Sequence, residues 1–247
     1  MLQITYVGHA SALIELDGVR LLTDPLHRRR IAHIRRVVDA PASEHLDRLD
    51  AVLLSHAHHD HLDVPSLKAL PGHPPVFCPR PAAGAVRAAG FEARVVTAGD
   101  GAEVGGVGIE TTEANHDGRR WPLPGRDRDA VGFVVRGAGG ETVYFAGDTG
   151  TEADFGAIGP VDVALLPVWG WGPKLGPGHM GPEEAAEAAA AVGAEVAIPI
   201  HWGTYERYLM KVGDRSDPAH RFEAKVAELA PEVKVEILEP GESLSID

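Results

Sequence analysis

Ser55-His56-Ala57-His58-His59-Asp60-His61 contains an H-x-H-x-D-H pattern, which is formed by His56, His58, Asp60 and His61. Imidazole nitrogens and carboxylate oxygens are the ligands that suit zinc and its neighbours in the transition series. Such side chains are costly to hold close together unless a cation lies among them. The alternative interpretation is a solvated loop that is rich in histidine. The pattern predicts a metal-binding segment.

The flanking sequence places this segment between a strand and a helix. Residues 50–55 form a short apolar run that is typical of a buried strand, and residues 62–70 have helix-like apolar spacing. Open α/β sheets bind ligands at the carboxyl ends of their strands. In such a turn His56 and His58 can face one side while Asp60 and His61 face another. One short segment can therefore serve two adjacent metal sites.

Length, charge and composition exclude several classes of protein. A chain of 247 residues can bury one core, so we expect a single domain over residues 1–247. The net charge of −13 disfavours a nucleic-acid partner. Cys78 is the one cysteine, which excludes an intrachain disulfide. We find no signal peptide and no apolar stretch near the ~20 residues that span a bilayer, and we expect a cytoplasmic protein.

Three further polar residues follow predicted strands elsewhere in the chain. His116 follows a β-like segment that ends at residue 115, Asp148 follows residues 143–147, and His201 follows residues 196–200. Taken singly, each is more simply a turn or capping residue. Taken after the H-x-H-x-D-H pattern, their shared position predicts that they complete one metal centre.

The chain resembles the metallo-β-lactamase-fold hydrolase superfamily over essentially its whole length. The resemblance implies an α+β fold, a four-layer αββα sandwich of two mixed β-sheets flanked by helices, with the metals at one edge. Within the superfamily, the closer resemblance is to the L-ascorbate-6-phosphate lactonase-like and N-acyl-phosphatidylethanolamine phospholipase D-like groups. It rests on GHAS at 8–11, LLTDP at 21–25, HMGPEEA at 179–185 and IPIHWGT at 198–204.

The resemblance also implies a centre of two divalent metal ions, most simply zinc, with manganese, iron and nickel left open. All the ligand positions are filled: His56, His58 and His116 for the first metal, Asp60, His61 and His201 for the second, and Asp148 between them. Asp24 matches the strand-end aspartate that supports the His-rich loop in this superfamily.

The implied function is a binuclear metal-dependent hydrolase. A hydroxide that bridges the two metals would attack a small or lipid-like phosphodiester, lactone or ester. Asp60 and His179 are the predicted catalytic residues. His179 precedes a predicted helix at 182–192, where backbone N–H groups favour anions, so it would bind an oxyanion or protonate the leaving group. Packing, or capping of that helix, is the alternative role.

Two other functions and two other features stay open. The other functions are a nuclease of the same fold and a non-catalytic, metal-binding regulatory protein. The basic segment from Arg28 to Arg36 could hold a phosphate or another anionic group of the substrate, or form a solvated surface. His9 could support a metal ligand or simply occupy a turn. The substrate and the oligomeric state are not predicted.

Overall fold

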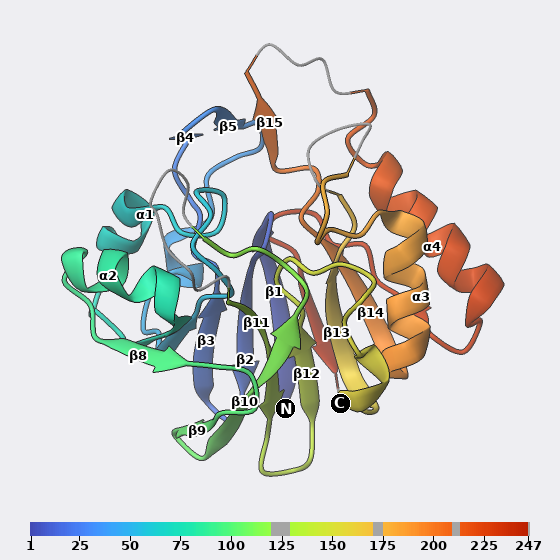
Figure 1. Cartoon of the computed structure of the whole chain (residues 1–247), viewed down its shortest axis with the longest axis horizontal. Helices are drawn as coiled ribbons and strands as arrows, with labels where there is room; N and C mark the ends of the chain where they lie inside the picture. The colour runs from blue at the N-terminus through green and yellow to red at the C-terminus, as the bar shows by residue number, and fades with distance from the viewer. Residues whose placement is uncertain (120–128, 170–174, 209–212, 247) are drawn as a thin grey trace.

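The computed structural model describes residues 1–119, 129–169, 175–208 and 213–246. Two seven-stranded sheets stand face to face, and a small three-stranded sheet lies above them (Figure 1). Apolar side chains from both large sheets meet between them, with Phe133, Phe145 and Ile198 fully buried. Burial of this apolar surface holds the two sheets together.

The first sheet has the order β17-β1-β2-β3-β6-β7-β8. The strands β1, β2 and β3 form an antiparallel meander, with an Asp17-Gly18 turn between β2 and β3, and β3, β6, β7 and β8 are parallel. The strands are β1 (Leu2–Gly8), β2 (Ser11–Leu16), β3 (Val19–Thr23), β6 (Ala51–Leu53), β7 (Val76–Pro79), β8 (Ala93–Val96) and β17 (Ser243–Ile246).

The second sheet has the order β16-β14-β13-β12-β11-β10-β9. It repeats the same plan, since β9 to β12 are antiparallel and β12, β13, β14 and β16 are parallel. The strands are β9 (Gly101–Val104), β10 (Val107–Ala114), β11 (Ala130–Arg136), β12 (Thr142–Phe145), β13 (Val161–Pro167), β14 (Ala194–Ile200) and β16 (Lys234–Val235).

Helices cover the outer face of each large sheet. In Figure 1, α1 (Val64–Lys68) and α2 (Arg80–Ala88) lie on the side of the first sheet, and α3 (Pro182–Val192) and α4 (Asp217–Leu229) lie on the side of the second. Short 3-10 turns lie at Ser43–His45 and Phe155–Ala157. The expected αββα sandwich is confirmed. None of the helices in the described ranges is long and apolar enough to cross a membrane.

The small sheet was not expected from the sequence. It joins β4 (Arg30–Ile31), β5 (Ile34–Arg36) and β15 (Tyr205–Arg207) in the order β15-β5-β4. The polar residues around Arg30 gave no strand pattern, because these strands are short and one pairing joins segments far apart in sequence, Arg36 opposite Tyr205. Ile31, Ile34 and Tyr205 form a separate apolar cluster beneath it.

The two chain ends lie side by side at one end of the sandwich. Strands β1 and β17 pair antiparallel, with Leu2 opposite Ile246. Figure 1 places both ends at the bottom, whereas the loops that follow β3, β6, β12 and β14 lie at the opposite end. These loops carry the predicted metal ligands, so the candidate site lies far from the termini.

Candidate metal centre

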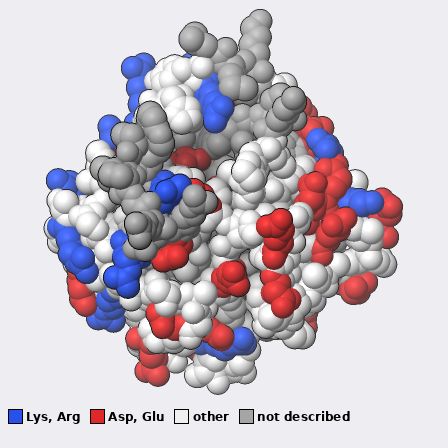
Figure 2. Space-filling model, viewed as in Figure 1, with Lys and Arg blue, Asp and Glu red and all other residues white. Residues whose placement is uncertain are grey.

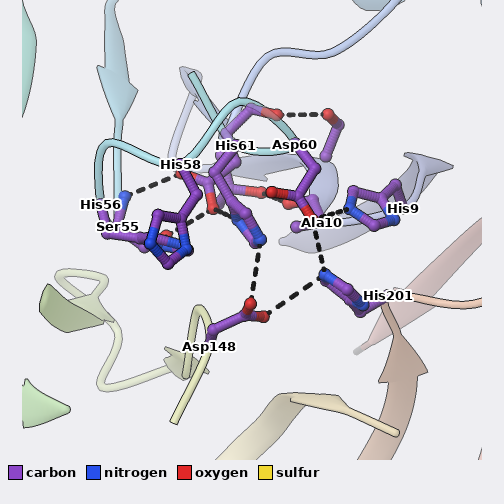
Figure 3. Close-up of polar contacts among 12 residues, drawn as sticks. His9, Ala10, Ser55, His56, His58, Asp60, His61, Asp148 and His201 are labelled. Atoms are coloured by element: carbon purple, nitrogen blue, oxygen red, sulfur yellow. Dashed lines mark hydrogen bonds and ion pairs between the residues drawn. The ribbon is translucent and has the colours of Figure 1, made fainter. Parts of the chain in front are cut away.

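The predicted ligands come together where strands of both large sheets end. Asp24 follows β3, the His-rich segment follows β6, His116 follows β10, Asp148 follows β12, and His201 follows β14. In the close-up, the His-rich loop faces Asp148 and His201 across the site (Figure 3). Each sheet therefore supplies one side of the centre, as the strand-end argument predicts.

Asp24 holds the His-rich loop in place. Its carboxylate is fully buried and accepts hydrogen bonds from the Ser55 backbone N–H (2.7 Å) and the Ser55 hydroxyl (2.6 Å). It also accepts one from His61 Nδ1 at 2.6 Å. These contacts tie Asp24 to both ends of the His-rich loop, and Asp24 also groups with His56 and His61.

The first cluster consists of His56, His58 and His116. One nitrogen from each ring lies within 4.8 Å of the others, and His116 Nε2 is 3.1 Å from His58 Nδ1. Because the Ser55 hydroxyl donates to Asp24, His56 Nδ1 must donate to Ser55 Oγ, at 3.0 Å. His116 Nδ1 donates to the Gly178 carbonyl at 2.8 Å. These hydrogen bonds leave Nε2 of His56 and of His116 with a lone pair that faces the cluster.

The second cluster consists of Asp60, His61 and His201, with His9 added to them. One donor atom from each of the four lies within 4.8 Å of the others. His201 Nε2 is 3.7 Å and His9 Nε2 is 3.8 Å from the Asp60 carboxylate. His61 and His201 are fully buried, whereas Asp60 is 22% exposed. The cluster is thus open to its surroundings at Asp60.

Asp148 lies between the two clusters. One of its carboxylate oxygens is 3.2 Å from His61 Nε2, and the other is 3.5 Å from His201 Nε2. It also groups with His116 of the first cluster. Gly147 precedes it with φ of 61°, and a Cβ there would lie 2.5 Å from the Ser55 Cβ. A side chain at position 147 would therefore push the two sides of the site apart.

Burial keeps several of these histidines neutral. It lowers the pKa of His116 to about 4 and that of His9 to about 3. Burial, followed by the neighbouring His61 and His116, lowers the pKa of His56 well below its usual value. Neutral imidazole is the form that binds a metal, so this environment favours coordination at neutral pH.

The carboxylates of Asp148 and Asp60 stay ionised although Asp148 is buried and Asp60 is largely enclosed. Burial opposes ionisation, but His201 and His61 hold the pKa of Asp148 well below its ordinary value. His201 and His9 do the same for Asp60. In turn, Asp148 and Asp24 outweigh burial and raise the pKa of His61 well above its ordinary value. A proton on His61 Nε2 therefore takes the place of a cation between His61 and Asp148.

These donors fit a divalent metal ion. Nε2 of His56 is buried and has no hydrogen-bond partner within the described ranges. An unpaired buried acceptor is costly, and a cation would satisfy it. Imidazole nitrogens beside carboxylate oxygens are a donor set typical of zinc.

His179 faces the site and not the helix that follows it. Its Nε2 lies 3.4 Å from Asp148, and its ring packs edge-on against His116 at 4.8 Å. The N–H of Gly181, the residue that caps α3, instead donates to the Glu184 carboxylate at 3.0 Å. Burial opposes it, but the hydrogen bond to Asp148 raises the pKa of His179. His179 can therefore donate a proton toward the metal edge.

His9 is the residue whose place the sequence did not settle. It lies in a turn with φ of 61°, and its ring is 3.9 Å from the His201 ring, centroid to centroid. Its carbonyl accepts from the His201 backbone N–H at 2.8 Å. His9 thus occupies a turn and also packs against the predicted ligand His201, so the two interpretations of this residue are compatible. The signal available in the sequence was Gly8-His9 directly after a strand.

Comparison with known proteins agrees with this geometry. A family model described as a beta-lactamase superfamily domain matches residues 19–202, more than half of the chain. The chain belongs to the metallo-β-lactamase superfamily. A UPF0173 metal-dependent hydrolase of Methanopyrus kandleri is 35% identical to this chain. The match covers 98% of this chain and 99% of that protein.

Two other proteins that the chain resembles are named as hydrolases. An N-acyl-phosphatidylethanolamine-hydrolyzing phospholipase D of Caenorhabditis elegans is 33% identical over 81% of this chain, which spans 64% of that protein. Among solved structures, the chain resembles Igni18, a metallo hydrolase from Ignicoccus hospitalis, with a TM-score of 0.77 and 26% identity. The match covers 100% of this chain and 98% of the Igni18 chain. The chain is thus placed among metal-dependent hydrolases of this fold.

Replacement of Asp24 should weaken metal binding without removing any predicted ligand. Asp24→Asn keeps the shape of the side chain but loses the charge that orients His61 Nδ1. We expect metal affinity to fall by about 10–100-fold, the usual effect of losing a carboxylate that supports a ligand. Titration of zinc against a competing chelator measures it, with exposed Asp50→Asn as the control. Equal affinity in both variants would contradict this role for Asp24.

Removal of His9 should flatten the acid dependence of stability in metal-free protein. His9 has a pKa of about 3 when folded and an ordinary value of 6.5, so only the unfolded chain gains this proton between those values. Stability is therefore lost as pH falls below 6.5, by about 2 kcal/mol from this residue between pH 7 and pH 5. Urea unfolding at pH 7 and pH 5 measures this loss. The fall in the free energy of unfolding should be smaller in His9→Asn than in the wild type, by about 2 kcal/mol. An unchanged loss would exclude a buried, neutral His9.

Proposed function

We propose that the protein is a binuclear metal-dependent hydrolase that acts on a small or lipid-like phosphodiester. The position of Asp148 carries this proposal, because its two oxygens face donors of different residues, His61 at 3.2 Å and His201 at 3.5 Å, and it also groups with His116. A carboxylate so placed can bind two cations side by side. We assign the remaining donors to two zinc ions, with His56, His58 and His116 on one and Asp60, His61 and His201 on the other.

When bound, two such cations supply Lewis acidity and lower the pKa of water toward neutrality. The protein fixes the donors before the reaction begins. Asp24 orients His61 at 2.6 Å, and the Gly178 carbonyl orients His116 at 2.8 Å. Because both contacts hold the Nδ1 proton, each ring presents Nε2 to the centre in the correct tautomer.

His179 is the proposed proton donor to the leaving group. It is 22% exposed and lies 3.4 Å from Asp148, so it borders the centre on a side that a substrate can reach. The raised pKa keeps more of its ring protonated near neutral pH. A donor beside the departing oxygen stabilises the negative charge that develops there.

The choice of a phosphodiester over a lactone or carboxylic ester rests on a relative. The C. elegans protein of 33% identity is by name a phospholipase D that hydrolyzes N-acyl-phosphatidylethanolamine. The same donor set would serve the attack of water on a carbonyl carbon. Lactones and carboxylic esters are therefore the substrates to test next.

Turnover of bis-p-nitrophenyl phosphate by zinc- or manganese-loaded protein tests the proposal. We expect metal-dependent release of nitrophenol that falls to background in Asp148→Ala, because this variant loses the carboxylate shared by both clusters. Metal content is measured on the same samples. Turnover of lactones or carboxylic esters, but not of this diester, by protein that holds both metals would overturn the phosphodiester assignment. If metal-loaded protein turned over no phosphodiester, lactone or carboxylic ester, the assignment as a hydrolase would be overturned.

Loss of His179 should slow the reaction without releasing metal. We expect His179→Ala to lower kcat by about 10²–10³-fold, the usual cost of losing one donor to a developing negative charge. The loss should be smaller for a diester with a better leaving group, which needs less protonation. A normal kcat would exclude the proton-donor role. A fall in metal content would instead make His179 a ligand.

A further inference from the structure

A cavity rich in arginine lies beside the small sheet. It has a volume of about 660 Å³ and is lined by residues of β4, β5 and β15, by residues just before β4, and by residues that follow β5 and β15. Its charged lining, here called the arginine cavity, is Arg29, Arg30, Arg35, Arg36, Arg215, Asp39 and Glu206. The three strands lie at the top of Figure 1, and Lys and Arg are prominent on the upper left of Figure 2.

The cavity has the opposite charge to the protein as a whole. Among the described residues, five arginines line it against two carboxylates, an excess of three positive charges in a chain of net charge −13. Figure 2 shows acidic residues concentrated instead on the right-hand side, where α3 and α4 lie. A concave surface lined by one sign of charge concentrates counter-ions of the other sign.

Three of these arginines already have hydrogen-bond or ion-pair partners, and Arg30 stacks over the Tyr208 ring at 5.9 Å. Arg36 is 6% exposed, and its guanidinium donates to the carbonyls of Val7 at 2.8 Å and Asp39 at 2.9 Å. Arg35 and Arg215 share one carboxylate, Glu206, at 3.5 and 2.8 Å. Arg36 thus belongs to the structure of the cavity wall, and Glu206 is saturated by its two partners.

Arg29 and Arg30 carry charges that the described residues do not neutralise. Both are exposed, and neither forms an ion pair with a carboxylate in the ranges that the structure describes. Arg30 also lies directly opposite Arg35 in the β4–β5 pair, on the same face. Like charges placed opposite each other destabilise a strand pair, so an anion bound here would remove a cost that is built into the sheet.

We propose that the arginine cavity is a binding site for a phosphate group, held chiefly by Arg29 and Arg30. The planar guanidinium fork matches the oxygens of a phosphate in pairs of hydrogen bonds. A phosphate dianion also offsets the local excess of positive charge more fully than a carboxylate does.

The site is separate from the metal centre but adjoins it. None of the residues that line it is a predicted metal ligand. Its wall reaches the metal edge through Arg36, which bonds the Val7 carbonyl, two residues before His9 in the chain. The proposal therefore stands even if the metal centre hydrolyses no phosphodiester. The phosphate could belong to a soluble phosphate ester or to a lipid headgroup.

Calorimetric titration of inorganic phosphate into the metal-loaded protein tests the site. We expect Arg29→Ala/Arg30→Ala to weaken cavity binding by at least about tenfold, since two charge-assisted contacts are lost. The matched control is Arg87→Ala/Arg136→Ala, which removes the same charge at exposed positions on α2 and β11. It should change the affinity by less than about twofold, because long-range charge effects are screened by salt.

The control also separates the cavity from the metals. Phosphate bound at the metal centre contributes equally to both double variants, so the difference between them reports on the cavity. Both pairs are exposed, and equal melting temperatures would show that both variants fold. The same phosphate isotherm in the wild type and in Arg29→Ala/Arg30→Ala would overturn the proposal. The proposal would also be overturned if the wild-type protein bound phosphate only at the metal centre.

Vesicles distinguish the two sources of phosphate. We compare sedimentation with phosphatidylcholine vesicles that contain or lack phosphatidic acid. Binding that needs phosphatidic acid, Arg29 and Arg30, and that free phosphate displaces, would identify a lipid headgroup. Phosphate binding that needs both arginines, without vesicle binding, would identify a soluble phosphate ester. Vesicle binding that is equal in the variant and the control would exclude the cavity as the membrane contact.

Discussion

The metal edge depends on one buried carboxylate, that of Asp24. A charged group without solvent is costly, and here three donors from Ser55 and His61 compensate it. These contacts fix the start of the His-rich loop at Ser55 and its end at His61. The intervening residues can then reach two different clusters from one short turn. Burial raises the pKa of Asp24, and the contacts with His61 and Ser55 oppose this rise.

The edge is also the place where two similar halves of the chain meet. Each large sheet begins as an antiparallel meander and continues as parallel strands whose carboxyl ends point the same way. The His201 N–H donates to the His9 carbonyl at 2.8 Å and joins the two sheets directly. Ligands drawn from both halves make metal binding an additional link between them, which would stabilise the folded state.

Three of the strand ends were predictable from the sequence because β6, β12 and β14 are short apolar runs followed by polar residues. This rule located Asp148 and His201 as well as the H-x-H-x-D-H segment. His116 instead follows β10, whose sequence is partly polar and was read as a strand from its β-like pattern. The rule failed for β4, β5 and β15, because these strands have only two or three residues each and carry arginines, and because β5 pairs with β15 over a long sequence distance. It also could not show that His9 packs on His201, because a single histidine in a turn has no periodicity. Contacts across the two sheets become visible only in three dimensions.

The pairing of β1 with β17 has a practical consequence. Leu2 lies opposite Ile246, at the end of the sandwich away from the metals. A tag, a surface anchor or another protein fused at either end would therefore extend away from the metal edge and leave access to it unchanged. Because the ends adjoin, a short linker could also close the chain on itself, and new ends could be opened in an exposed loop. The fold thus offers two attachment points on one side and chemistry on the other.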